Sequence, residues 1–304
     1  MSQQSCFVEV LGTAQDGGVP QLGCYCVNCQ RALSNKKHKL TVASIGIINP
    51  NSGQSYLIDA TPNIIEQVAL LHNTKLRVVP SIDKTIKFQT RAFAGLNGIF
   101  LTHAHMGHYL GLAHLGKESC NVSSIPVYAT SKMIKFLSEN QPFCDLINNC
   151  NIIPNIITPQ KECEKECLKE PGLRITPIKV QHRHEHSDTV GFVINSTKKT
   201  LLYIPDIDKL TEDILEIISK VDVAIIDGTF YDKTEIPSGR KYNEIPHPLI
   251  KNSMHLLAGM VKKTKIVFSH FNHTNPVVDP KSEAASELKK NSFGIAAAGQ
   301  IMRL

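Results

Sequence analysis

Three histidines lie close together in the segment THAHMGH, residues 102–108, which directly follows the apolar run NGIFL. Neutral imidazole is the commonest protein ligand for zinc and iron. His103, His105 and His108 are spaced so that a tight turn after a buried strand can direct all three at one or two ions. The segment therefore predicts a metal site, and a surface cluster of histidines without a metal is the alternative.

Further residues of ligand type follow strand-like runs elsewhere in the chain. They are Asp59, His182, His184, His186, Asp206 and His270. Each of them alone has an ordinary explanation, because an Asp or His after a strand is commonly a turn residue or a hydrogen-bonded polar group. Taken with the first cluster, they predict one pocket built from several strand ends. In such a pocket Asp59 can orient a metal-bound histidine by accepting its second N–H.

Three of the nine cysteines form a second cluster, in the segment CYCVNC. Cys24, Cys26 and Cys29 can face one tetrahedral zinc ion that takes its fourth ligand from elsewhere in the chain. Cys163 and Cys167 stand in a charged run that favours a solvated helix or loop over a second metal knuckle. We interpret the others as core or surface thiols: Cys6, Cys120, Cys144 and Cys150.

The composition is that of an ordinary globular chain, with 304 residues of which 42% are hydrophobic. There is no apolar run long enough for a membrane span, and residues 1–5 lack the features of a signal peptide. We therefore expect a cytoplasmic protein with reduced thiols and no membrane partner. The formal charge of +6 comes mainly from short lysine patches without interleaved aromatic residues. This pattern favours a solvated basic surface over a nucleic-acid groove, and it suits an anionic substrate.

Strand-like runs and helical stretches are interspersed along the chain. The expected strands are 6–11, 43–48, 55–59, 98–101, 125–128, 173–180, 190–194, 201–204, 223–227 and 265–269. The expected helices are 63–71, 110–118, 131–139, 212–220, 249–262 and 281–289. Thr61, followed by Pro62, and Thr211 are expected N-caps. Because no linker-like change of composition interrupts this order, we predict one layered α/β domain over residues 1–304.

The order of these motifs resembles the metallo-β-lactamase superfamily: an Asp-ending strand, a turn of clustered histidines, a later His, an Asp and a final His. Within it, the chain is similar to the PqqB branch, named after coenzyme PQQ biosynthesis, with the phosphodiesterase PhnP as a cousin. The strings that carry the likeness are LGTAQDGGVPQ, HR with TVG, IPD and HFNHTNP, and the likeness covers nearly the whole chain. It implies an αββα sandwich of two mixed sheets with helices outside, and a small zinc knuckle at residues 23–30.

The resemblance implies two metal positions with Asp206 as a bridging carboxylate. The ligands of the first would be His103, His105 and His182, and those of the second His108 and His270. The catalytic residues would be Asp59, His182 and Asp206.

The same resemblance implies a structural zinc ion at the cysteine knuckle. His273 would be its fourth ligand, with His270 as the fallback. Zinc is also the expected metal of the active site, where Fe2+ or Mn2+ is the alternative.

The chain departs from the superfamily's usual turn, His-x-His-x-Asp-His, because Gly107 stands in the place of the Asp. The second metal position is therefore short of one carboxylate, which should weaken it. Three outcomes remain open: a one-metal enzyme, a two-metal site repaired by another residue, or a fold that has lost catalysis. Asp16, in the Gly-rich loop after the first strand, and His184, which would share a face with His182 on an extended segment, are the candidates for the repair.

These residues favour a metal-dependent enzyme, broadly a hydrolase, that acts on a small or peptide-derived anionic substrate. Small cyclic phosphates or nucleotides are alternative substrates, for a phosphodiesterase. The PqqB likeness implies instead an iron-dependent oxidative modification of a PQQ precursor. A non-catalytic carrier of PQQ or its precursor is the alternative from another class of protein, and a homodimer remains open.

Overall fold

The computed structural model describes residues 4–79, 96–159, 168–236 and 245–304, and its strands form two sheets. The strands of the first sheet are β1 (Phe7–Gly12), β2 (Ser44–Asn49), β3 (Gln54–Ile58), β4 (Gly98–Phe100), β5 (Ile125–Ala129), β6 (Ile152–Ile156) and β14 (Ile301–Arg303). Those of the second are β7 (Leu168–Glu170), β8 (Leu173–Val180), β9 (Thr189–Ser196), β10 (Thr200–Ile204), β11 (Val223–Asp227), β12 (Lys265–Ser269) and β13 (Gly294–Ile295).

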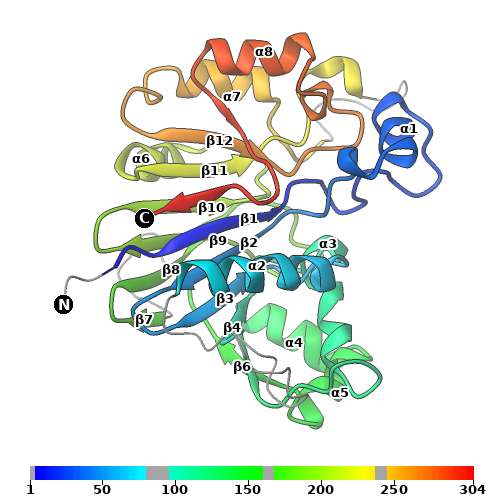
Figure 1. Ribbon diagram of the computed structural model, residues 1–304, viewed down its shortest axis with the longest axis vertical. Coiled ribbons are helices and arrows are strands. Elements are labelled where there is room, and N and C mark those ends of the chain that lie inside the picture. Colours follow the sequence, from blue (N-terminus) through cyan, green and yellow to red (C-terminus); the bar gives the residue numbers. More distant parts are fainter. Residues whose placement is uncertain (1–3, 80–95, 160–167, 237–244) are drawn as a thin grey trace.

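The α-helices of the described residues fall into two groups along the chain, and most of them pack on the outer faces of the sheets. Those of the first half of the chain are α1 (Val27–Ser34), α2 (Ile64–Val78), α3 (Met106–Tyr109), α4 (Ser131–Glu139) and α5 (Phe143–Asn148). Those of the second half are α6 (Glu212–Lys220), α7 (Ile250–Leu257) and α8 (Glu283–Lys290). Figure 1 shows the sheets back to back, with α2, α4 and α5 outside one and α6, α7 and α8 outside the other. This arrangement confirms the predicted αββα fold class.

The two sheets are mixed, with seven strands each. Their orders are β14-β1-β2-β3-β4-β5-β6 and β13-β12-β11-β10-β9-β8-β7. In the first sheet β3, β4, β5 and β6 run parallel, and in the second β10, β11, β12 and β13 do. Since parallel strands end at the same edge of a sheet, the loops that follow them are collected there.

Side-chain alternation along the strands builds three layers of core. Tyr56 and Ile58 of β3 point into the core between the sheets, whereas Leu57 between them packs with the outer helices. In the second sheet Tyr203 of β10 points inward and Leu202 packs under the other helices. Burial on both faces explains why these strands read as continuous apolar runs.

The ten predicted strands are all present, and each end lies within two residues of its predicted position. The helix predicted over 110–118 is wrong, since a 3₁₀ helix occupies Leu110–Leu115. There Gly111 N–H donates to Ala60 O at 2.9 Å, and a Cβ on Gly111 would meet Thr61 O at 2.1 Å. This close backbone approach leaves no room for a regular helix with side chains on that face.

The other predicted helices begin within two residues of their predicted starts, but α2 continues to Val78 beyond the predicted end at 71, and α7 ends at Leu257 before the predicted 262. The N-cap of α2 is Asn63, not Thr61, whose hydroxyl instead accepts from Asn63 N at 3.0 Å. Thr211 is the N-cap of α6, as predicted. The short helices α1, α3 and α5 and the strands β6, β7, β13 and β14 were not predicted. The charged run with Cys163 and Cys167 lies outside the described residues.

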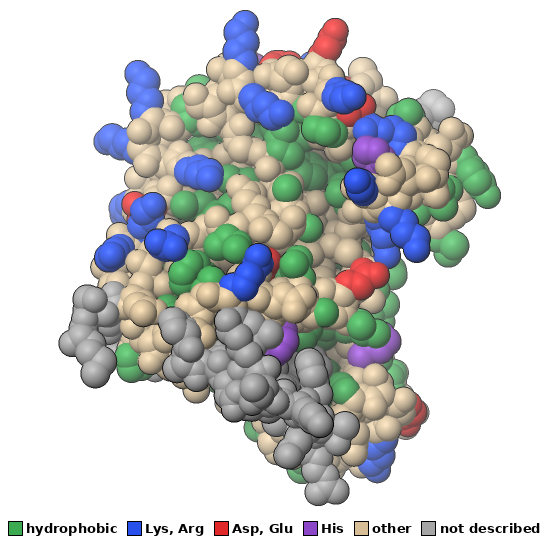
Figure 2. Space-filling view, viewed as in Figure 1, with side chains coloured by type: hydrophobic (Ala, Val, Ile, Leu, Met, Phe, Trp, Pro, Cys, Tyr) green, Lys and Arg blue, Asp and Glu red, His purple; other side chains and the backbone are tan. Residues whose placement is uncertain are grey.

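The surface carries its basic residues in a dispersed pattern. Figure 2 shows Lys and Arg side chains spread over the upper part of one face and over the lobe formed by α1.

Among the described residues, none of the helices is both long enough and apolar enough to cross a membrane.

The core between the sheets gives a first prediction. Phe192 of β9 is fully buried there, and its ring meets that of Phe100 edge-on with 5.5 Å between the centroids. Phe192→Ala should lower the free energy of unfolding by about 3–5 kcal/mol because it leaves a large cavity. Ile156→Ala, at a side chain that is 64% exposed on β6, is the control and should change it by less than about 0.5 kcal/mol. Denaturant unfolding measures both, and equal effects would contradict this core.

Candidate metal centre

The candidate ligands come from the loops at one end of the two sheets. Asp59 directly follows β3, His270 directly follows β12, and Asp206 follows β10 after one proline. Asp59 and His270 have φ angles of 69° and 63°, in the left-handed region that non-glycine residues seldom adopt. Such backbone persists only where the surroundings enforce it, and it concentrates at functional sites.

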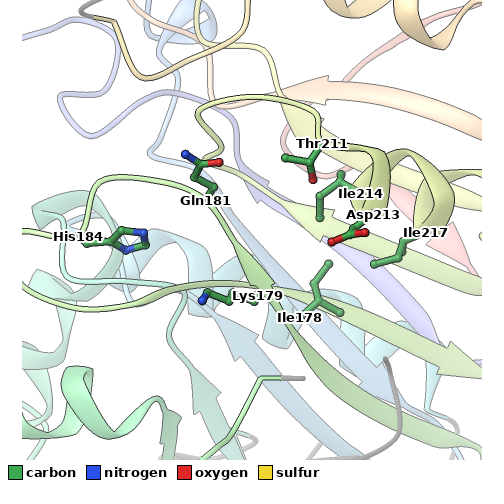
Figure 3. A pocket seen from close by; sticks show the side chains of 8 residues that line it. All are labelled: Ile178, Lys179, Gln181, His184, Thr211, Asp213, Ile214 and Ile217. Carbon is green, nitrogen blue, oxygen red and sulfur yellow. The ribbon is translucent and has the colours of Figure 1, made fainter. Parts of the chain in front are cut away.

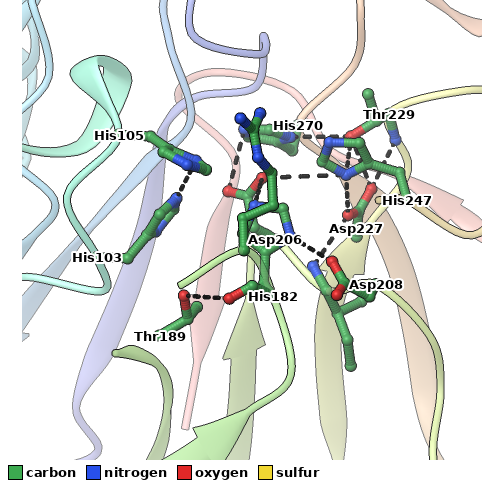
Figure 4. Close-up of polar contacts among 12 residues, drawn as sticks. His103, His105, His182, Thr189, Asp206, Asp208, Asp227, Thr229, His247 and His270 are labelled. Carbon is green, nitrogen blue, oxygen red and sulfur yellow. Dashed lines mark hydrogen bonds and ion pairs between the residues drawn. The ribbon is translucent and has the colours of Figure 1, made fainter. Parts of the chain in front are cut away.

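Three imidazoles form the first part of the site. The ligand nitrogens of His103, His105 and His182 all lie within 4.8 Å of one another. His103 Nε2 is 2.8 Å from His105 Nδ1, and His182 Nε2 is 3.6 Å from Asp206 Oδ1. Figure 4 shows His103 and His105 on one side of Asp206, with His247 and Asp227 on the other. The structure therefore brings together the residues proposed for the first metal position.

Asp206 also faces the histidines proposed for the second position. Its Oδ2 lies 3.1 Å from His108 Nε2 and 3.2 Å from His270 Nε2. One carboxylate thus contacts histidines from three different loops, those after β4, β8 and β12. The two oxygens of Asp206 therefore face histidines proposed for both metal positions.

Four of these buried ligand atoms have no hydrogen-bond partner in the described part of the chain. They are His108 Nε2, His182 Nε2, His270 Nε2 and Asp206 Oδ2. The three histidine nitrogens contact the Asp206 carboxylate as ion pairs at 3.1–3.6 Å, but none of the four atoms makes a hydrogen bond of ordinary geometry. Buried polar atoms nearly always make such hydrogen bonds, so four that converge without them need an explanation. Imidazole and carboxylate donors in this arrangement fit zinc or another first-row divalent metal.

The outer nitrogens of the three histidines are held by neighbouring side chains. The pairs are Asp59 Oδ2 with His108 Nδ1 (2.8 Å), Asp208 Oδ1 with His182 Nδ1 (3.0 Å) and Thr229 Oγ1 with His270 Nδ1 (3.0 Å). Asp59 is fixed in turn, since its Oδ1 accepts from the backbone N–H of Thr102 at 2.9 Å. These contacts direct each Nε2 into the pocket, which is how the partners of metal-bound histidines act.

The carboxylates of the pocket stabilise positive charge beside them. Burial favours a protonated Asp206, but His270 and His108 outweigh it and hold the pKa of this carboxyl well below its usual range. Burial disfavours charge on His108 as well, yet Asp59 and Asp206 raise its pKa well above the usual value. Burial keeps the pKa of His103 well below the usual value, so this imidazole is neutral and able to bind a metal.

The cysteine knuckle forms a separate cluster with His273. The Nδ1 atom of His273 is 3.3 Å from Cys24 Sγ, 3.5 Å from Cys26 Sγ and 3.7 Å from Cys29 Sγ. Asn28 at the start of α1 donates its Nδ2 to His273 O and to Asn275 O, both at 3.0 Å. Three thiols and one imidazole suit a tetrahedral zinc ion, and His270 belongs to the other cluster.

His184 lies away from both clusters, contrary to the expectation that it could approach the metal pocket. The chain from 181 to 188 is not an extended strand, so His182 is buried whereas His184 and His186 are exposed. Figure 3 shows His184 and Gln181 at a different cavity, of about 400 Å³, opposite Ile214 and Ile217 of α6. Two residues of separation do not place side chains on one face once the strand has ended.

Two buried residues of the site were not predicted. His247 Nδ1 is 2.7 Å from Asp227 Oδ2, and the ligand atoms of His247, His182 and Asp206 lie within 4.8 Å of one another. Asp227 ends the apolar strand β11 just as Asp59 follows β3, so the same sequence signal could have found it. His247 stands between two prolines after no predicted strand, and no pattern in its neighbourhood marks it.

A second cavity, of about 790 Å³, lies between the knuckle and the metal pocket. Asp16 and the Gly17-Gly18 turn line it on one side, and Phe230 and Asn272 on another. Lys39 is also among its lining residues. Its volume is in the range of sites for small organic ligands.

Comparison with known proteins identifies the class to which this fold and site belong. The family model of the β-lactamase superfamily domain matches residues 54–271. The chain therefore belongs to the β-lactamase superfamily. The match begins at β3 and ends just after His270, so it includes the candidate ligands of the pocket other than Asp16.

Within the superfamily the chain is similar to coenzyme PQQ synthesis protein B. It is 25% identical to that protein of Nitrosococcus oceani, over 95% of this chain and 97% of the relative. It is 26% identical to that of Klebsiella pneumoniae, over 98% of each. The fold is that of zinc-bound PqqB from Methylobacterium extorquens (TM-score 0.77, 23% identity, 98% of this chain and 100% of that one). It is also that of a diphosphatase of the PhnP family (TM-score 0.68, 19% identity, 98% and 97%).

The contact between Asp59 and His108 gives a prediction for metal affinity. Asp59→Asn removes the charge that orients His108, and it should weaken metal binding in the pocket about 10–100-fold. Competition with a chromophoric chelator measures this. Asp213→Asn, at an exposed carboxylate of α6, is the control and should leave the affinity unchanged. A wild-type affinity in Asp59→Asn would refute the orienting role.

The knuckle gives another prediction. His273→Ala removes one of four donors, and the protein should lose one equivalent of zinc while the segment before and within α1 becomes sensitive to protease. Elemental analysis and limited proteolysis measure the two effects. His255→Ala, at an exposed histidine of α7, should match the wild type. If His273→Ala also matches it, another residue completes the knuckle.

Proposed function

We propose that this chain is a metal-dependent hydrolase that acts on a small or peptide-derived anionic substrate. The observation that carries the proposal is the convergence of four buried ligand atoms from His108, His182, His270 and Asp206, which face one another without a hydrogen bond of ordinary geometry. The fold supports it, because the chain belongs to the β-lactamase superfamily. Zinc is the expected metal at both clusters, and Fe2+ or Mn2+ is the alternative in the pocket.

The residues around the pocket have separate parts in such a reaction. When bound, the metal supplies Lewis acidity and acidifies water. Asp206 stays a carboxylate, so it can accept a hydrogen bond from the nucleophile and hold it in place. Asp59 and Asp208 keep His108 and His182 in their orientations. The cavity of about 790 Å³ would hold the substrate; its charged lining residues are Asp16, Glu235 and Lys39, which pairs with Glu66 at 3.1 Å.

The likeness to coenzyme PQQ synthesis protein B supports a peptide-derived quinone precursor as the first substrate class, because it extends over nearly the full length of both chains. It also supports an iron-dependent oxidative modification of such a precursor as the second candidate reaction. Phosphodiesters such as small cyclic phosphates are the next substrate class, which the fold shared with a PhnP-family diphosphatase supports.

The proposal predicts that metal and activity disappear together. In His103→Ala, one metal equivalent beyond the knuckle zinc should be lost, and hydrolysis of a chromogenic phosphodiester such as bis(p-nitrophenyl) phosphate should fall at least about 100-fold. His184→Ala is the matched control, since it lies two residues from His182 but outside the pocket, and it should retain both. Elemental analysis and initial rates measure the outcome with zinc, iron or manganese loaded.

Other results would favour the other candidates. Metal that is lost in His103→Ala without any hydrolysis, but with dioxygen consumed by the iron-loaded protein, would favour the oxidative reaction. One equivalent of zinc in the wild type, unaffected by His103→Ala, would contradict an enzyme and favour a carrier of a quinone precursor.

A further inference from the structure

The turn with the three histidines lacks a side chain at Gly107, yet the space for one is already filled. A Cβ atom on Gly107 would come within 2.1 Å of Asp16 Oδ1 and 2.9 Å of the α-carbon of Asp16. Such distances do not occur between real atoms, and the α-carbon belongs to the backbone, which cannot rotate away as a side chain can. Asp16 therefore occupies the volume that an aspartate at position 107 would need.

Backbone conformation does not account for the glycine. The described glycines with positive φ are Gly18, Gly23, Gly53, Gly172 and Gly299. Gly107 instead belongs to the short helix α3, whose backbone any L-residue can adopt. The constraint at position 107 is thus Asp16, through both its carboxylate and its α-carbon.

The carboxylate of Asp16 faces the second metal position. Its Oδ1 lies 3.5 Å from His108 Nε2, and it accepts the backbone N–H of Gly107 at 3.1 Å. The ligand atoms of Asp16, His108 and His270 lie within 4.8 Å of one another. With Asp206, which contacts both histidines, the position has two imidazoles and two carboxylates.

The loop that carries Asp16 is fixed to the strand end that carries His270. Gln15 N–H donates to Phe271 O at 2.9 Å, and Phe271 N–H donates to Thr13 O at 2.7 Å. Gly18 N–H donates to Gln15 O at 2.8 Å and closes a turn around Asp16. The carboxylate is therefore held beside His270 by backbone hydrogen bonds, and its side chain is only 25% exposed.

We infer that Asp16 is a ligand of the second metal ion, and that it takes over the part of the aspartate missing from the histidine turn. Gly107 is the residue that makes room for it. The inference rests on the proposed function in that it requires metal in the pocket. It deepens that function because it makes the site dinuclear, with Asp206 between the ions.

The test is the metal stoichiometry and affinity of the purified full chain, titrated with zinc. The wild type should hold one ion at the knuckle and two in the pocket. Asp16→Ala and Asp16→Asn should each bind the second pocket ion at least about 100-fold more weakly, because a direct ligand should matter no less than an outer contact. Asp213→Asn, at an exposed carboxylate, should match the wild type.

A second, independent test moves the carboxylate from position 16 to position 107. Gly107→Asp alone should clash with Asp16, and both the second ion and thermal stability should be lost. The double variant with Asp16→Gly and Gly107→Asp should bind the second ion more tightly and unfold at a higher temperature than Gly107→Asp alone, because the Oδ1 clash at 2.1 Å is gone and only the 2.9 Å contact with the α-carbon of residue 16 remains. Such recovery shows direct coupling between the sites, and it cannot arise from a variant that merely unfolds.

The outcomes separate the inference from the proposed function. If Asp16→Asn keeps the second ion with wild-type affinity, Asp16 is not a ligand and the inference is overturned while the enzyme proposal stands. If the wild type binds a single ion in the pocket and His103→Ala loses it, there is no second ion for Asp16 to bind. The inference is then overturned as well, and the enzyme proposal stands. A wild type that binds zinc only at the knuckle overturns both.

Discussion

The site depends on one buried carboxylate, Asp206, surrounded by imidazoles from separate loops. An ionised carboxylate that is 3% exposed would be strongly destabilising without compensation. The compensation comes from His108, His182 and His270. The Nδ1 atom of each of these histidines contacts a neighbouring side chain, which keeps its Nε2 directed at the carboxylate. Since these three follow different strands, the charge at the centre requires that the strand ends converge, and the strands in turn require a filled core between the sheets.

The two sheets explain how these charged and polar side chains can be held together in a buried pocket. Asp59, His182, Asp206 and His270 each stand within two residues of the end of a strand, and those strands are fixed by sheet hydrogen bonds and by buried side chains such as Phe192 and Tyr203. The left-handed backbone of Asp59 and His270 is tolerated at the points where two strands give way to loops. The sheets thus supply the rigidity, and the loops supply the direction of each side chain.

The knuckle and the pocket share one segment of chain. His270 belongs to the pocket, His273 faces the cysteines, and Phe271 between them pairs with the loop that carries Asp16. Zinc at the knuckle would therefore hold the segment that positions both His270 and Asp16. The knuckle is thus joined to the pocket by a short stretch of backbone that carries a residue of each cluster.

The sequence by itself determined the fold class, the ten principal strands and most candidate ligands, because burial on two faces leaves apolar runs and the ligands follow those runs directly. It also marked the departure at Gly107. Only the tertiary structure decided which residues meet. Asp16 and Gly107 are separated by 91 positions, and His247 and Asp227 by 20, so their contacts depend on how loops are packed against one another. For the same reason the structure alone separated His270 from His273 and directed His184 away from the pocket, since periodicity no longer fixes side-chain direction beyond the end of a strand.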